Sequence, residues 1–104
     1  MTNKQQYGIY KQRIIDDLGI SESDFNTFRL IGKTLNRLYC RNCNGTISEL
    51  KYEELTRMQY SRADRISKKL GLYIYYQTDP RGATIYLDDK PIPENNYNVA
   101  HCIY

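Results

Sequence analysis

Two pairs of side chains have the chemistry of zinc ligands. Cys40 and Cys43 form a Cys-x-x-Cys pair, and His101 and Cys102 are adjacent much later in the sequence. Four thiolate or imidazole ligands are what a tetrahedral structural zinc site requires. Adjacent residues on a strand point to opposite faces, so His101 and Cys102 are poorly placed to reach one ion. We therefore interpret the thiols as small buried side chains and expect no metal site.

Residues suited to acid–base or nucleophilic catalysis are few. The chain has one histidine, no glycine-rich phosphate loop and no nucleophile elbow. Asp79 and Arg81 stand two residues apart and are conceivable as an acid and an anion clamp. They belong to Asp79-Pro80-Arg81-Gly82, in which Asp and Pro suit the first two positions of a type I turn. Because no base pairs with a nucleophile, we expect a protein that is not an enzyme and needs no cofactor.

Basic side chains recur at helical spacing in two stretches. The first basic stripe is Arg29, Lys33, Arg37 and Arg41, and the second basic stripe is Arg62, Arg65 and Lys69. Like charges four residues apart cost a helix roughly 0.2–0.5 kcal/mol per pair, so an acidic group is expected nearby. Candidates inside the chain are Asp16, Asp17, Glu49, Glu53 and Glu54. Phosphates, an acidic partner surface, or a merely solvated face remain as alternatives.

The stretch from Leu72 to Leu87 predicts a β-hairpin, because apolar and polar positions alternate on both sides of the turn at 79–82. One face would be apolar, with Leu72, Ile74, Ala83, Ile85, Leu87 and Tyr76. The other would carry Tyr73, Tyr75 and Tyr86, with Arg81 at the tip. Tyr and Arg are enriched at interface hot spots, so this tyrosine face is a candidate partner-binding surface.

Three helices precede the hairpin. The first ends at Gly19, and the second begins at Ser21, with Asp24 as its capping-box partner, and runs to about Arg41. A third helix is expected to begin with a capping box of Thr46 and Glu49 and to end near Leu70. Residues 97–104 read as a last strand. The pattern predicts an α+β fold of three helices followed by a small antiparallel sheet, in one domain spanning 1–104, with the second and third helices over the hairpin.

The charge is divided unevenly. Residues 1–70 hold 13 Lys and Arg against 8 Asp and Glu, whereas residues 71–104 hold 2 against 4. The helical part is therefore basic and the sheet part slightly acidic. No apolar run is long enough to span a bilayer and no signal-peptide pattern is present, so we expect a cytosolic protein.

One motif resembles a known group. Gly71-Leu72-x-Ile74-Tyr75-x-Gln77-x-Asp79-Pro80-Arg81-Gly82-x-x-x-Tyr86, with Cys43-Asn44-Gly45 upstream, is similar to small proteins encoded by tailed bacteriophages and prophages. In that group two or three helices precede a GLxVYxQxDPRGxxLY-like hairpin. Ala83-Thr84-Ile85 replaces the Cys-Ala-Leu expected there, so a role for that cysteine is absent. The resemblance implies a phage origin and action in a host bacterial cell, and it carries no established activity.

These observations lead to two functional hypotheses. The first is a phage-encoded binding protein that inhibits or redirects a host macromolecule, as anti-defence and anti-CRISPR proteins do, with a protein or nucleoprotein partner and no membrane. The alternative is a nucleic-acid-binding accessory protein that uses the two basic stripes. Salt sensitivity separates them, because binding to phosphates weakens steeply as salt rises.

The purified protein is expected to carry no stoichiometric zinc, and a chelator should leave its thermal unfolding curve unchanged. A structural zinc ion contributes directly to folding free energy, so its removal would lower the midpoint. Elemental analysis that finds one zinc per chain would reverse this interpretation of Cys40, Cys43, His101 and Cys102.

Overall fold

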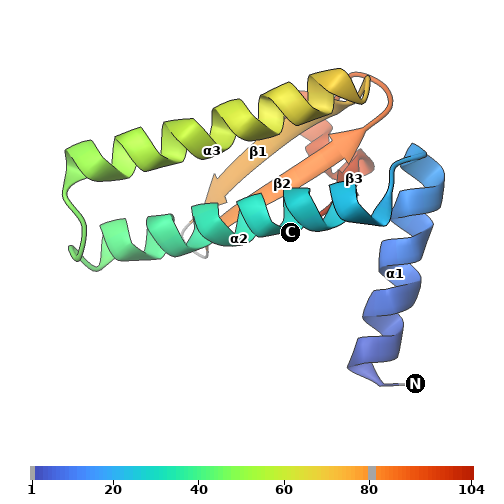
Figure 1. The fold of residues 1–104 in the computed structure, drawn as a ribbon, viewed down its shortest axis with the longest axis horizontal. Helices are drawn as coiled ribbons and strands as arrows, with labels where there is room; N and C mark the ends of the chain where they lie inside the picture. Colours follow the sequence, from blue (N-terminus) through green and yellow to red (C-terminus); the bar gives the residue numbers. More distant parts are fainter. Residues whose placement is uncertain (1, 80–81) are drawn as a thin grey trace.

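The fold is α+β, as the sequence predicts. The computed structural model describes residues 2–79 and 82–104, with three helices followed by a three-stranded antiparallel sheet (Figure 1). The elements are α1 (Asn3–Leu18), α2 (Glu22–Cys43), α3 (Glu49–Lys69), β1 (Tyr73–Asp79), β2 (Gly82–Asp88), the 3-10 helix η1 (Glu94–Val99) and β3 (His101–Cys102).

The helix ends follow from side-chain capping. At the start of α2, the Ser21 hydroxyl accepts a hydrogen bond of 3.0 Å from the backbone N–H of Asp24, which confirms Ser21 as the N-cap of the predicted capping box. The predicted cap of α3 is wrong: Ser48, and not Thr46, accepts from Lys51 N at 3.2 Å. Thr46 instead closes the preceding helix, because its hydroxyl and its backbone N–H both donate to the carbonyl of Arg41. The last carbonyls of a helix have no partner within the helix, and Thr46 supplies hydrogen bonds to one of them at the end of α2.

The hairpin is formed with the predicted faces. β1 and β2 pair in antiparallel register, with Ile74 opposite Leu87 and Tyr75 opposite Tyr86. Ile85 and Leu87 are fully buried on the side that α2 and α3 cover, which confirms the apolar face (Figure 1). The proposed type I turn includes residues 80 and 81, which lie outside the described residues.

The predicted last strand is present but is shorter than the expected range of 97–104. Only His101 and Cys102 are strand, paired with Leu87 and Tyr86, while the chain before them forms η1. The N–H of Ala100 donates to the carbonyl of Tyr97 at 3.0 Å, which is the bond of a tight turn and prevents an extended run.

The core lies between α2 and the sheet. Phe25, Phe28 and Ile31 from α2 are fully buried with the core-facing residues of β2, and Ile14 adds α1 to the same cluster. Their 3.6-residue spacing produces this single apolar stripe. No helix in the described residues is long and apolar enough to cross a membrane.

The C-terminal residue joins α1 to α2. In Figure 1, α1 diverges from the layer made by α2 and α3, and the C-terminus lies against α2. Tyr10 donates a 2.6 Å hydrogen bond from its hydroxyl to the carbonyl of Cys102. The Arg29 guanidinium lies 4.4 Å from the Tyr7 ring centre and 5.9 Å from that of Tyr104. These contacts attach α1 to the chain's end through cation–π attraction and hydrogen bonding.

A matched pair of glycine substitutions tests this packing. A Cβ on Gly32 would lie 2.7 Å from Tyr104 Cβ, whereas a Cβ on Gly8 meets nothing within 4 Å. Gly32→Ala should lower the free energy of unfolding by about 1 kcal/mol or more through overpacking. Gly8→Ala should raise it by roughly 0.5–1 kcal/mol, because alanine favours a helix over glycine. Denaturant unfolding measures both, and equal stabilisation by the two variants would contradict the close approach of Tyr104.

Candidate protein-binding surface

Three tyrosines form an aromatic cluster on the sheet face that points away from α2 and α3. Tyr75 and Tyr86 are directly opposite each other on β1 and β2, with ring centres 6.5 Å apart. Tyr97 from η1 stacks on Tyr75 at 5.0 Å with an interplanar angle of 10°. It also meets the edge of Tyr86 at 5.0 Å and 61°. We call Tyr75, Tyr86 and Tyr97 the tyrosine cluster, in which each ring is held by the other two.

Tyr97 was missed by the sequence analysis. Reading 97–104 as a strand placed this ring at the edge of the sheet instead of over its face. The signal that it belongs to a turn is Pro93 followed by Asn95 and Asn96, residue types that favour turns. Because Tyr97 covers part of the predicted tyrosine face, Tyr75 and Tyr86 are half-buried.

Tyr73 and Arg81 are the other two residues predicted for this surface. Tyr73 lies on the same face as Tyr75 and is 48% exposed, so it is the most accessible ring of the hairpin. Its cross-strand neighbour Asp88 is only 5% exposed. The structure therefore brings Tyr73, Tyr75 and Tyr86 to one face, while Arg81 lies outside the described residues.

The four residues of the first basic stripe are not equally exposed. Arg29 is half-buried against the two aromatic rings that join α1 to the C-terminus, whereas Lys33, Arg37 and Arg41 are exposed. In the second basic stripe Arg62, Arg65 and Lys69 are all exposed.

Internal carboxylates do not neutralise either stripe. The acid–base contacts within 4 Å in the described part of the chain join Lys11 to Glu22 at 2.9 Å and His101 to Asp17 at 3.7 Å. Asp17, one of the expected acidic partners, thus faces His101. Of the exposed members, Arg41 donates a 3.5 Å hydrogen bond to the carbonyl of Thr46, and none takes part in an ion pair within the described residues.

The predicted burial of the cysteines is wrong for two of the three. Cys40 and Cys43 are exposed because they occupy the end of α2, which extends beyond the sheet (Figure 1). Cys102 is half-buried in β3, and burial raises the pKa of its thiol. Within residues 2–79 and 82–104 no group of three or more His, Cys, Asp or Glu side chains is placed to hold a metal ion.

A polar pair connects α3 to β1 beneath the helical layer. The Tyr76 hydroxyl donates to Asp64 Oδ1 at 2.7 Å and lies 3.3 Å from the carbonyl of Tyr60. Its ring meets that of Tyr60 edge to face at 4.4 Å. Burial, followed by the hydrogen bond and charge of Asp64, raises the pKa of Tyr76 well above its usual value. This pair is structural, since it fastens the half-buried Tyr76 of β1 to the exposed Asp64 of α3.

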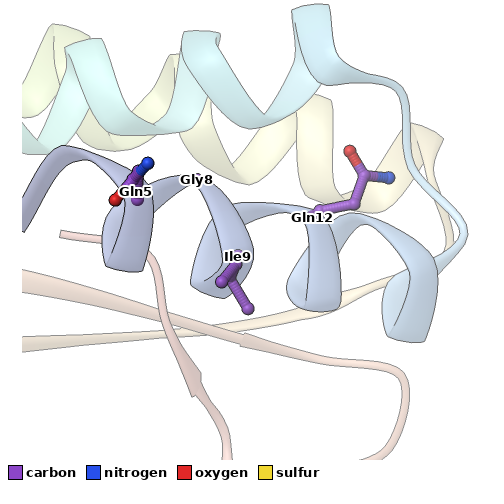
Figure 2. A pocket seen from close by; sticks show the side chains of 4 residues that line it. All are labelled: Gln5, Gly8, Ile9 and Gln12. Carbon is purple, nitrogen blue, oxygen red and sulfur yellow. The ribbon is translucent and has the colours of Figure 1, made fainter. Parts of the chain in front are cut away.

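A shallow hollow lies on α1, where Gln5, Gly8, Ile9 and Gln12 share one side of the helix (Figure 2). Ile9 is 52% exposed and points away from the helix, and Gly8 leaves a gap beside it (Figure 2). Two amides and one aliphatic side chain supply no acid, base or nucleophile, so this hollow offers no chemistry of its own.

The raised pKa of Tyr76 predicts a loss of stability at high pH. The unfolded chain releases the phenolic proton near pH 10, whereas the folded chain retains it to higher pH. Stability should therefore be complete below about pH 10 and fall as the pH rises above that value. Tyr76→Phe should make this fall shallower, at the cost of about 1 kcal/mol near neutral pH for the lost hydrogen bond. Denaturant unfolding between about pH 7 and 11.5 measures the slope, and identical slopes for both proteins would contradict the prediction.

Comparison with known proteins does not assign the chain to a family. No family model matches it, and neither a search of curated protein sequences nor one of solved structures finds a match.

Proposed function

We propose that this chain is a non-enzymatic binding protein that docks on a partner protein through Tyr73, the tyrosine cluster and Arg81. The observation that carries the proposal is the set of ring contacts among Tyr75, Tyr86 and Tyr97, one stacked and two inclined, which places three rings in fixed positions on the face opposite the helices. Rings that are already ordered lose little conformational entropy when a partner buries them. Tyrosine also combines a large apolar area with a hydroxyl that can bond to the partner.

The biological setting of the proposal rests on the phage-like motif at 71–86. On that basis the partner is a macromolecule of the host bacterial cell that the chain blocks or redirects, in the manner of an anti-defence or anti-CRISPR inhibitor acting in the cytoplasm. A protein or a nucleoprotein complex is the expected partner.

A second candidate function is nucleic-acid binding through the basic stripes. It is favoured by the exposure of Lys33, Arg37 and Arg41 on α2 and of the second stripe on α3, none of them in the ion pairs found among the described residues. The engagement of Arg29 with two rings removes one charge from this surface. The slightly acidic sheet part offers no continuation of a positive groove, so we place this function second.

Alanine substitutions separate the two surfaces. Once a partner has been recovered from host lysate treated with nuclease, Tyr75→Ala and Arg81→Ala should each weaken binding by more than about 1 kcal/mol, as hot-spot residues do. Tyr52→Ala, which removes a half-buried ring on α3, is the matched control for Tyr75, and Arg57→Ala is the control for Arg81. Isothermal titration with the partner measures each loss, and circular dichroism confirms that the variants fold.

Charge reversal provides the opposite test. Arg37→Glu and Arg65→Glu, each made alone, should act mainly on the association rate and on salt sensitivity. If these reversals abolish binding while Tyr75→Ala and Arg81→Ala leave it intact, the basic stripes are the working surface and the second function replaces the first.

A further inference from the structure

The outer edge of β1 is an unpaired strand edge. The sheet order is β1-β2-β3, so β1 has a neighbour on one side only. On β2, the N–H of Ile85 donates to Tyr104 O and its carbonyl accepts from Ile103 N, which shows that the backbone of Ile85 points away from β1. Residues opposite each other in an antiparallel pair point either toward each other or both away. Tyr76, opposite Ile85, therefore directs its backbone N–H and C=O to the open edge, as do Ile74 and Thr78.

This edge lacks the features that normally block strand addition. Proteins protect edge strands with lysines, prolines, bulges or a covering segment. From Leu72 to Thr78 the sequence has no charge and no proline, and the pairing with β2 continues without a bulge. In residues 2–79 and 82–104, no hydrogen bond reaches the outward backbone groups of Ile74 or Tyr76.

A groove runs along the beginning of this edge. It lies between the second half of α3 and β1, and Ser67 and Lys68 line one side while Leu72 and Ile74 line the other. In Figure 1, α3 passes over the start of β1 and diverges from it along the strand. A strand added beside β1 would lie about 4.8 Å from it, with alternate side chains turned into this groove.

The rim of the groove carries positive charge. Arg65 and Lys68 are exposed, and neither takes part in an ion pair within the described residues. The carboxylate in the lining, Asp64, already accepts the hydrogen bond from Tyr76. An apolar floor with a basic rim is complementary to an extended segment that alternates apolar and acidic side chains.

We propose that an extended segment of a partner protein adds to the edge of β1 as a fourth strand, with its apolar side chains against Leu72 and Ile74 and an acidic side chain beside Arg65 and Lys68. This inference rests on the proposed protein-binding function and identifies the kind of partner. A second copy of the chain fits less well, because the one carboxylate that its own β1 offers to the basic rim is Asp79, at the very end of the strand. The added strand would also continue the sheet face that carries Tyr73 and Tyr75, so that one partner can contact the edge and the rings.

The test uses a synthetic heptapeptide of sequence Thr-Val-Thr-Asp-Thr-Val-Thr, acetylated at its N-terminus and amidated at its C-terminus. NMR titration of the full-length protein labelled with nitrogen-15 should show saturable shifts at the amides of Ile74, Tyr76 and Thr78, with a dissociation constant below about 1 mM. Two N-methylated versions of the peptide provide the decisive comparison, one methylated on the threonines and the other on the remaining residues. Because one set of peptide N–H groups faces β1 and the other faces away, only one version should lose binding.

Charge-reversal variants of the protein test the basic rim, with a matched control pair elsewhere on α3. Arg65→Glu with Lys68→Glu should weaken peptide binding about tenfold or more, whereas Lys51→Glu with Arg57→Glu, an equal charge change elsewhere on α3, should change it less than threefold. The inference is overturned if the amide shifts do not saturate or if both N-methylated peptides bind equally. It is also overturned if the edge amides shift on concentrating the protein alone, since a second copy would then occupy the edge. If the peptide fails while Tyr75→Ala still weakens partner binding, strand addition is wrong and the proposed function stands.

Discussion

The two-residue alternation of the hairpin determines where every other element lies. Because successive side chains of a strand point to opposite faces, Ile85 and Leu87 can enter the core only if Tyr86 leaves it. A shift of one residue in the register would bury the tyrosines and expose the aliphatic residues, which the apolar face of α2 would not tolerate. The same constraint that builds the core thus presents Tyr73, Tyr75 and Tyr86 together on the other face.

Features that depend on local physics could be predicted from the sequence. Helical spacing located α1, α2 and α3, and alternation located the hairpin and assigned its faces. The errors arise where two different groups compete for the same residue. Thr46 is a residue type that suits the N-cap of α3, but its hydroxyl donates to the carbonyl of Arg41 instead, and Ser48 is the N-cap. Residues 97–99 lie in a 3-10 helix, in which the ring of Tyr97 stacks on Tyr75, a contact between residues far apart in the sequence that the local pattern does not reveal.

Burial of single side chains was harder to predict, because it depends on the relative lengths of the elements. Cys40 and Cys43 looked like core residues on a helix whose apolar stripe ends nearby at Leu38. The two hairpin strands β1 and β2 are only seven residues long, whereas α2 has 22 and α3 has 21, so the far end of the helical pair extends beyond the sheet (Figure 1). From the rise per residue, α2 is about 33 Å long, whereas a seven-residue strand is about 23 Å long. Cys40 and Cys43 lie in the last turn of α2, in the part that extends past the strands. The regular spacing of Arg29 with Lys33 was likewise misleading, since the ring of Tyr104 reaches Arg29 from the other end of the chain.

β1 is the strand that leaves the most surface available to a partner. β1 contributes Ile74 and Tyr76 to the helical side and Tyr73 and Tyr75 to the opposite side, and its outer backbone groups are unpaired among the described residues. A partner that pairs with this edge gains backbone hydrogen bonds that are insensitive to its sequence, so specificity has to come from side chains. Under the proposed strand addition, the basic rim of the groove selects the partner's side chains on one face of β1, and the ordered rings select them on the other. The basic rim and the tyrosine rings lie on opposite sides of β1, so a partner strand must carry side chains suited to each of them at alternate positions. This requirement is far narrower than the one that either surface imposes alone.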